Sequence, residues 1–294
     1  MKNQSLFLLA ALAFAATACM ENGLLDHGMY AKGSSLFNTS SYDASTEALM
    51  SANFEDIDQT TDEAFDRYFA QAGRFSAGNL DCAEVTKDSV NKVITIDFGD
   101  GCENKKGTVK SGKIIITYSG ERGVPGATKV VTFEDFFIDS VQVEGVRTVM
   151  NVSDTSVEGL RVFETSMVGG KHTFSDGTTI TREANHTRTR YRSENTEESY
   201  ASLTGNASGT LQDGTAYTMD IISEILITGA CDIKVPVSGV KEFVAGDNMV
   251  TVDFGDGTCD NLAEVTTNGE TETIELKSRG LGKHKGNRGR GNRG

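Results

Sequence analysis

The sequence has no tryptophan, two prolines, four histidines and one long apolar run, residues 6–16. That run is shorter than the roughly 20 apolar residues that a membrane-spanning helix needs. The sequence contains none of three common catalytic motifs: the Gly-x-Ser-x-Gly nucleophile elbow, the His-Glu-x-x-His zinc motif and the phosphate-binding loop. We therefore expect no cofactor and no enzymatic activity. A glycan-directed hydrolase remains the alternative, because a glycosidase needs only two carboxylates and acids are abundant.

Basic residues are scarce outside one terminus. The chain has 28 Lys and Arg against 42 Asp and Glu, a net charge of −14. Seven bases and no acid lie in residues 277–294: Lys277, Arg279, Lys283, Lys285, Arg288, Arg290 and Arg293. Without these seven and Lys2, 20 bases face 42 acids, a net charge of −22. Phosphate binding needs a basic surface, so we expect no nucleic-acid partner.

The first 18 residues have the features of an export signal. Lys2 precedes the apolar run, and Ala16-Thr17-Ala18-Cys19 follows it. This end resembles the lipobox of bacterial lipoproteins, although Ala16 stands where leucine is usual. The resemblance implies cleavage before Cys19 and stable anchoring by lipid on its thiol. The alternative is ordinary cleavage after Ala18, which leaves Cys19 a free thiol.

The mature chain is predicted to have three parts. Residues 19–43 form a flexible tether, because they are rich in Gly, Ser and Asn and have no periodicity. Residues 44–276 form a folded domain. Residues 277–294 form a disordered basic tail. This tail either holds the acidic body near lipopolysaccharide or an acidic partner, or only increases solubility.

The folded domain is predicted to begin with a helix over residues 44–72. Thr60 followed by Glu63 fits a capping box. Apolar residues then recur at helical spacing and predict a packing face: Ala64, Phe65, Tyr68, Phe69 and Ala72. We expect the nearby acids to form a solvated face: Glu55, Asp56, Asp58, Asp62, Glu63 and Asp66.

From Cys82 onward the period changes to two, which is typical of strands. Segments rich in Val, Ile, Thr, Phe and Tyr predict strands at 93–98, 113–119, 128–138, 141–150, 157–168, 178–190 and 217–228. The connections are short and no helical pattern separates them, so we expect antiparallel pairing. The predicted fold class is mainly β: a meander, sandwich or curved sheet of about a dozen strands, with one or two short N-terminal helices.

Three internal repeats occur in this region. Residues 173–181 resemble 210–218, and each copy holds an Asp-Gly pair that predicts a hairpin turn with positive φ at both central positions. A Val-Glu-Gly segment is repeated at 143–147 and 157–161. Residues 94–102 resemble 250–259, which predicts two related ends of the fold.

The last repeat also pairs the cysteines, because a second cysteine precedes each copy. A hairpin centred near Val90 brings Cys82 close to Cys102, and one centred near Gly246 brings Cys231 close to Cys259. We therefore predict disulfides Cys82–Cys102 and Cys231–Cys259, as expected in an oxidising compartment. A four-thiolate metal site is disfavoured because no closely spaced cysteine pair occurs.

The repeated Asp-Phe-Gly-Asp-Gly string resembles part of PKD domains, β-sandwich modules of surface proteins and glycan-degrading enzymes. Its carboxylates are calcium-ligand candidates: Asp97, Asp100, Asp253 and Asp256. The alternative, which we favour, is that the glycines form the turn and the aspartates accept hydrogen bonds from its amides.

A broader resemblance extends over about residues 82–276. It includes the two Asp-Phe-Gly strings, Ser111-Gly112-Lys113, Pro125-Gly126 and Val143-Glu144-Gly145. The chain resembles a group of uncharacterised lipoproteins of Bacteroidota. This resemblance implies an outer-membrane location on the periplasmic or the surface face, and no particular activity.

Basic residues alternate along one predicted strand. Arg182, His186, Arg188, Arg190 and Arg192 are expected on one face of the sheet. One interpretation is a binding site for an anionic glycan, formed by Arg182, Arg188, Arg190 and Arg192. The other, which we favour, is cross-strand pairing with acids such as Glu194, Glu197 and Glu198.

These features predict a lipid-anchored, non-catalytic binding or structural module of the cell envelope. The expected partners are the membrane, through the lipid, and an anionic glycan, lipopolysaccharide or an envelope protein. The second alternative besides the hydrolase is a lipid carrier with a curved sheet. A sheet face lined with Leu, Ile and Phe would favour that carrier, and a filled core would argue against it.

Overall fold

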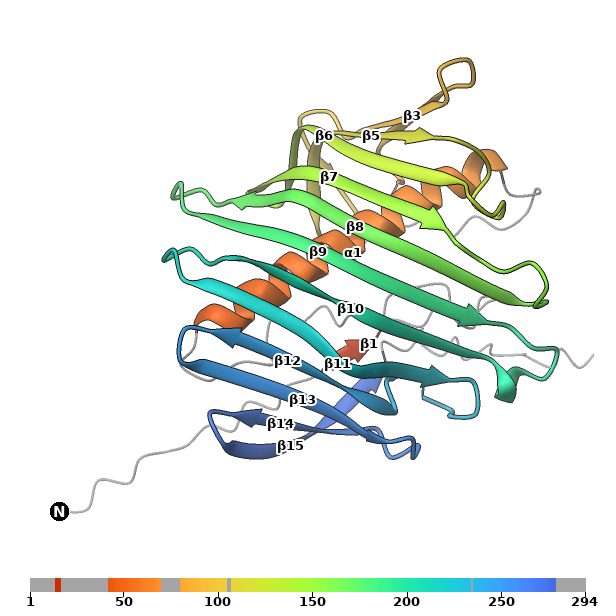
Figure 1. Cartoon of the computed structure of the whole chain (residues 1–294). Coiled ribbons are helices and arrows are strands. Elements are labelled where there is room, and N and C mark those ends of the chain that lie inside the picture. Colours follow the sequence, from red (N-terminus) through yellow and green to blue (C-terminus); the bar gives the residue numbers. More distant parts are fainter. Residues whose placement is uncertain (1–13, 17–41, 70–79, 105–106, 234, 279–294) are drawn as a thin grey trace, which may run out of the picture.

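The computed structural model describes residues 14–16, 42–69, 80–104, 107–233 and 235–278 (Figure 1). One sheet of 15 strands contains most of them, and one long helix, α1 (Tyr42–Phe69), lies across one face of this sheet. The fold class is mainly β, as predicted. Cys19, the expected tether up to residue 41 and residues 279–294 of the expected tail lie outside the described residues.

The strands, in chain order, are β1 (Phe14–Ala16), β2 (Glu84–Asp88), β3 (Val93–Asp97), β4 (Cys102–Glu103), β5 (Val109–Tyr118), β6 (Thr128–Ile138), β7 (Val141–Asn151), β8 (Leu160–Thr173), β9 (Thr179–Tyr191), β10 (Tyr200–Thr210), β11 (Ala216–Thr228), β12 (Ser238–Ala245), β13 (Asn248–Asp256), β14 (Leu262–Thr267) and β15 (Glu270–Ser278). A short 3-10 helix, Thr196–Glu198, precedes β10.

The sheet is an antiparallel meander in which strands adjacent in sequence are also adjacent in space. The order from β5 to β15 is unbroken, β3 and β2 follow at one edge, and β4 pairs with the end of β5. At the other edge, β1 pairs in parallel with the end of β15. The short connections that predicted antiparallel pairing are hairpins in the structure.

Helix α1 differs from the prediction in length and in its capping. It is one helix of 28 residues instead of one or two short ones. The predicted capping box at Thr60 is wrong: Thr60 lies in the middle of the helix, where its hydroxyl donates to the Asp56 carbonyl at 2.7 Å. No helix in the described ranges combines the length and the apolar character that crossing a membrane requires.

The apolar stripe of the helix packs as predicted. Ala64 and Phe65 are buried, and the Phe65 and Phe69 rings contact Tyr118 of β5 edge-on. Tyr68 donates a hydrogen bond to the Val85 carbonyl of β2. Ala72 lies outside the described residues. This aromatic contact fixes the C-terminal end of α1 on the edge of the sheet.

The two Asp-Gly hairpins form as predicted, but with a different turn geometry. Gly177 donates a backbone hydrogen bond to the Phe174 carbonyl, and Gly214 donates one to Leu211 in the same way. Only the glycine has positive φ, at 83° and 88°. Each loop is therefore a turn followed by a glycine bulge, in which Asp176 and Asp213 accept from amides two residues ahead.

The repeated Val-Glu-Gly segment does not form equivalent structures. Gly145 lies inside β7 at a bulge, where an added Cβ would lie 2.8 Å from the Gly170 Cα atom of β8. Gly159 instead precedes β8, and the expected strand at residue 157 begins only at Leu160. The two disulfides do form as predicted, with Cα–Cα distances of 5.6 Å for Cys82–Cys102 and 5.5 Å for Cys231–Cys259.

A candidate anion-binding hollow between helix and sheet

The middle of helix α1 faces the sheet with acidic side chains. Glu55, Asp58 and Asp62 are separated by three and four residues, so they lie on one side of the helix. Glu55 and Asp58 are each 6% exposed. The expected solvated face is therefore wrong for these acids, because the helix turns them toward basic side chains of the sheet.

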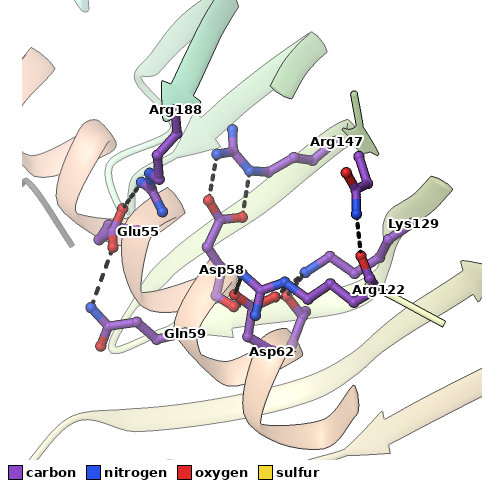
Figure 2. A network of polar contacts seen from close by, with 10 residues as sticks. Glu55, Asp58, Gln59, Asp62, Arg122, Lys129, Arg147 and Arg188 are labelled. Carbon is purple, nitrogen blue, oxygen red and sulfur yellow. Dashed lines mark hydrogen bonds and ion pairs between the residues drawn. The ribbon is translucent and has the colours of Figure 1, made fainter. Parts of the chain in front are cut away.

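Ion pairs join this acidic side to several strands (Figure 2). Arg147 of β7 forms a bidentate ion pair with Asp58 and donates one hydrogen bond to each carboxylate oxygen. Asp62 contacts Lys129 of β6 at 2.6 Å and Arg122 of the β5–β6 connection at 2.8 Å.

Two further ion pairs join the helix to β9 on one side and to β5 on the other. Glu55 contacts Arg188 of β9 at 3.1 Å, and its other oxygen accepts from Gln59 at 3.4 Å. Asp56 contacts Lys110 of β5 at 2.6 Å, and Lys110 also donates to Thr60.

Asp62 and Arg147 keep their charges although they are buried. Burial alone would raise the pKa of Asp62, but the charges of Arg122 and Lys129 outweigh it and hold that pKa well below its ordinary value. Burial likewise would lower the pKa of Arg147, and the facing Asp58 carboxylate raises it above the ordinary value. Asp62 and Arg147 are therefore charged at neutral pH.

A small hollow of about 20 Å³, partly open to solvent, lies beside the Glu55 end of this row. Helix α1 contributes Ser51, Phe54 and Glu55 to its wall, and the sheet contributes Arg147, Thr165, Arg182, Ala184, His186, Arg188 and Leu203. Strands β7, β8, β9 and β10 meet here in register, since Thr165 lies opposite His186 and Leu203 opposite Arg188.

The wall of the hollow is rich in basic groups. It contains three guanidinium groups (Arg147, Arg182 and Arg188), of which Arg188 contacts Glu55 and Arg147 contacts Asp58. Burial, with the charge of Arg182 next, lowers the pKa of His186 to about 3, so this ring is neutral. Such a wall suits an anionic group, because guanidinium forks bind carboxylate and phosphate oxygens well.

Two histidines have buried ring nitrogens without a hydrogen-bond partner among the described residues. They are the half-buried His186, through Nε2, and the buried His172 of β8, through both nitrogens; the His172 ring contacts Phe54. Burial, again with Arg182, lowers the pKa of His172 to about 3. Buried polar atoms normally have partners, so the Nε2 of His186 is an unsatisfied polar atom at the wall of the hollow.

The structure brings only part of the predicted arginine set together. Arg182 and Arg188 line the hollow, but Arg190 and Arg192 are not among its lining residues, and Arg192 is exposed beyond the end of β9. Arg188 contacts Glu55 of the helix, and cross-strand pairing, the alternative that we favoured, stays a prediction.

The calcium candidates accept hydrogen bonds at turns. Asp97 accepts from the Gly99 amide, Asp253 from Gly255 and Asp256 from Thr258, as in the alternative to metal binding. Asp100 is exposed. Within the described ranges, no three His, Cys, Asp or Glu side chains lie together in a way that could hold a metal ion.

The sequence reasoning missed Arg147 and Glu55 as members of the candidate site. The spacing of Glu55, Asp58 and Asp62 is that of a buried stripe, and this signal could have identified the acids as a contact face. Arg147 gave no such signal, because its role depends on strand pairing with Met167 of β8 and on the path of the helix.

The chain was also compared with known proteins. No protein-family model matches it, and neither the curated proteins nor the solved structures contain a significant match.

Proposed function

We propose that this protein is an exported lipoprotein of the cell envelope, anchored by lipid on Cys19, that acts as a non-catalytic binding module. Its ligand carries an anionic group that enters the hollow beneath helix α1. The single observation behind this proposal is the wall formed by Arg147, Arg182, Arg188 and the unpartnered His186 Nε2.

Export is supported by the sequence and by the two disulfides. The lipobox-like Ala16-Thr17-Ala18-Cys19 stands at the end of an apolar run. Both disulfides join cysteines that an oxidising compartment would pair, which leaves Cys19 as the one cysteine outside them. We extend this to the outer membrane, on the periplasmic or surface face, by the resemblance to Bacteroidota lipoproteins.

The packing of helix α1 favours a binding module over a lipid carrier. Met50, Phe54, Ile57 and Phe65 are at most 3% exposed and belong to the same apolar cluster as the inner residues of the sheet. The helix therefore occupies the face that an acyl chain would need.

The first test follows the anchor in a bacterial host that processes lipoproteins. Metabolic labelling with a fatty acid should label the wild-type protein, and Cys19→Ser should abolish the label and release the protein from the membrane fraction. The matched control Cys82→Ser with Cys102→Ser removes a disulfide and should keep the label. A labelled Cys19→Ser protein would contradict lipid anchoring at this residue.

The second test addresses the hollow in the purified full chain, solubilised in mild detergent. Calorimetric titration with acidic and neutral oligosaccharides should show binding of acidic ones only, and lowered salt should strengthen it. Arg182→Gln should weaken this binding about tenfold or more, since a hydrogen bond to a charged group is worth roughly 1.5–3 kcal/mol. The absence of binding to every anionic probe would overturn the proposed function of the hollow.

A further inference from the structure

We propose that the first half of helix α1 is an acid-sensitive lid: protonation of His172 and His186 releases it from the sheet, while the second half of the helix stays in place. This inference concerns the helix itself and does not depend on the proposed ligand. Three features support it: the position of the two rings, the charges around them, and the different contacts of the two halves of α1.

Both rings lie at the interface between helix and sheet. His172 of β8 is fully buried, and its ring meets Phe54 of α1 edge-on, with 5.1 Å between the ring centroids. His186 of β9 lines the small hollow, whose wall also contains Phe54. Among the described residues, neither nitrogen of His172 and not the Nε2 of His186 has a hydrogen-bond partner. A protonated ring would bury a charged donor without an acceptor, so the closed interface favours the neutral form of both rings.

The charged group that acts on His172 is basic. Arg182 is 4% exposed and lies on β9 two residues from Ile180, which is opposite His172. Burial, and after it the charge of Arg182, lowers the pKa of His172 to about 3. The neighbours from the other elements are uncharged, because Val143 of β7 lies opposite His172 and Phe54 covers the ring from the helix.

His186 faces bases from three strands. Burial, and after it these positive charges, lowers its pKa to about 3. The bases are Arg182 and Arg188 of β9, Arg147 of β7 and Lys241 of β12. On the adjacent strands β8 and β10, the residues opposite His186 are the uncharged Thr165 and Gly205. The acid that α1 contributes to the same wall, Glu55, contacts Arg188. A proton on this ring therefore adds positive charge to a region that is already basic.

The two halves of α1 are held to the sheet by different contacts. In the second half, Asp56, Asp58 and Asp62 form ion pairs with bases of β5, β7 and β6 (Figure 2), and aromatic rings pack on Tyr118. The lowered pKa of Asp62 keeps its carboxylate charged at pH 5. In the first half, Phe54 packs on His172, and Glu55 contacts Arg188 in the wall that contains His186. Protonation of the two rings therefore acts on the first half and leaves these contacts of the second half intact.

The size of the effect follows from the coupling of proton binding to opening. Each ring has a pKa of about 3 in the closed interface and the ordinary value of 6.5 once it is released, so the open form binds protons more readily below pH 6.5. Lowering the pH from 7.5 to 5 should raise the equilibrium constant for opening about 30-fold for each histidine, and about 1,000-fold for both.

The test is hydrogen–deuterium exchange of the full chain in mild detergent at pH 7.5 and pH 5, read by mass spectrometry and corrected for the intrinsic pH dependence of amide exchange. The protection of residues 49–55 should fall by about 30-fold to 1,000-fold at pH 5, whereas that of residues 58–69 and of strand β13 should stay within about threefold.

Histidine variants identify the groups that titrate. His172→Phe and His186→Gln should each remove about 30-fold of the pH effect, and the double variant should remove all of it, because neither new side chain binds a proton in this range. Glu144→Gln is the matched control, since this residue is 45% exposed on the other face of the sheet, and it should keep the full pH effect. Circular dichroism at pH 7.5 establishes that each variant is folded. If one is not, the comparison of regions within the wild type decides.

Three results would overturn the proposal. Unchanged protection of residues 49–55 between pH 7.5 and pH 5 would show that acid does not open the helix. An equal loss of protection in β13 would mean that the whole chain unfolds and that no lid opens by itself. A loss in residues 49–55 that persists in the double variant would show that other groups titrate.

Discussion

Two ion pairs of strand β7, one on each face of the sheet, differ in how far their side chains are exposed to solvent. Arg147 points to the helix side and pairs with Asp58, where both side chains are about one-tenth exposed. Three residues earlier, Glu144 points to the opposite face and pairs with Lys171 of β8 at 2.7 Å, with side chains 45% and 41% exposed. The Gly145 bulge lies between them.

Burial, and not the N–O distance, determines how much each pair contributes to the free energy of unfolding. An exposed pair is screened by water and salt and typically contributes 0–1 kcal/mol. Breaking a buried pair leaves a charge in a low-dielectric interior and costs roughly 3–5 kcal/mol. The helix-side pairs therefore specify how α1 lies on the sheet, while the outer pair is nearly dispensable.

The largest expected effect comes from breaking the inner pair. Asp58→Asn leaves the Arg147 charge buried without its carboxylate, so the free energy of unfolding should fall by about 3–5 kcal/mol in urea titrations. Replacing both partners, Asp58→Leu with Arg147→Met, should recover most of this loss, because no buried charge remains. If the double variant is as unstable as Asp58→Asn, then the lost packing shape and not the charge is responsible.

An intermediate loss of stability is expected when the pH is lowered, because His172 is buried in its neutral form. The pKa of His172 is about 3 in the folded protein and about 6.5 when unfolded, so the unfolded chain binds more protons between these values. Stability should therefore fall as the pH drops below 6.5, by about 2 kcal/mol at pH 5 for this residue. Below pH 3.8 the lowered pKa of Asp62 adds a further loss of stability, because its carboxyl binds a proton more readily in the unfolded chain than beside Arg122 and Lys129.

His172→Phe provides the measurement. It keeps a ring against Phe54 but cannot bind a proton, so the difference in stability between pH 7 and pH 5 should shrink by about 2 kcal/mol relative to the wild type. The exposed Glu144→Gln is the control, and its pH dependence over this range should equal that of the wild type. An unchanged slope in His172→Phe would contradict a neutral buried histidine.

The strands, hairpins and disulfides of the sheet were predictable because they depend on local sequence signals. Period-two segments predicted the antiparallel strands, Asp-Gly pairs predicted two hairpins, and the repeated cysteines predicted both disulfides. The prediction of positive φ at both central turn positions was wrong. Asp176 and Asp213 take part in bulged loops, and an Asp-Gly pair alone does not distinguish such a loop from a two-residue turn.

The inner face could not be predicted in the same way. Acids on a helix are usually solvated, and only the tertiary position of α1 turns Asp58 and Glu55 toward the sheet. The basic alternation on β9 correctly placed Arg182, His186 and Arg188 on one face of the sheet. It could not predict that Arg182 and Arg188 line the hollow and that Arg192 does not.

The smallest expected effect comes from the outer pair and completes the comparison. Glu144→Gln removes a carboxylate from a 2.7 Å contact with Lys171, at a distance like those of the buried pairs. Its free energy of unfolding should nevertheless change by less than about 0.5 kcal/mol, and the residual effect should disappear near 1 M salt, where the screening length is about 3 Å. The change caused by Asp58→Asn should persist at that salt concentration, because both side chains of the pair are only about one-tenth exposed and are screened little. A loss above about 2 kcal/mol for Glu144→Gln would mean that exposed fraction does not govern these pairs, and that the β7–β8 contact itself needs the outer charge.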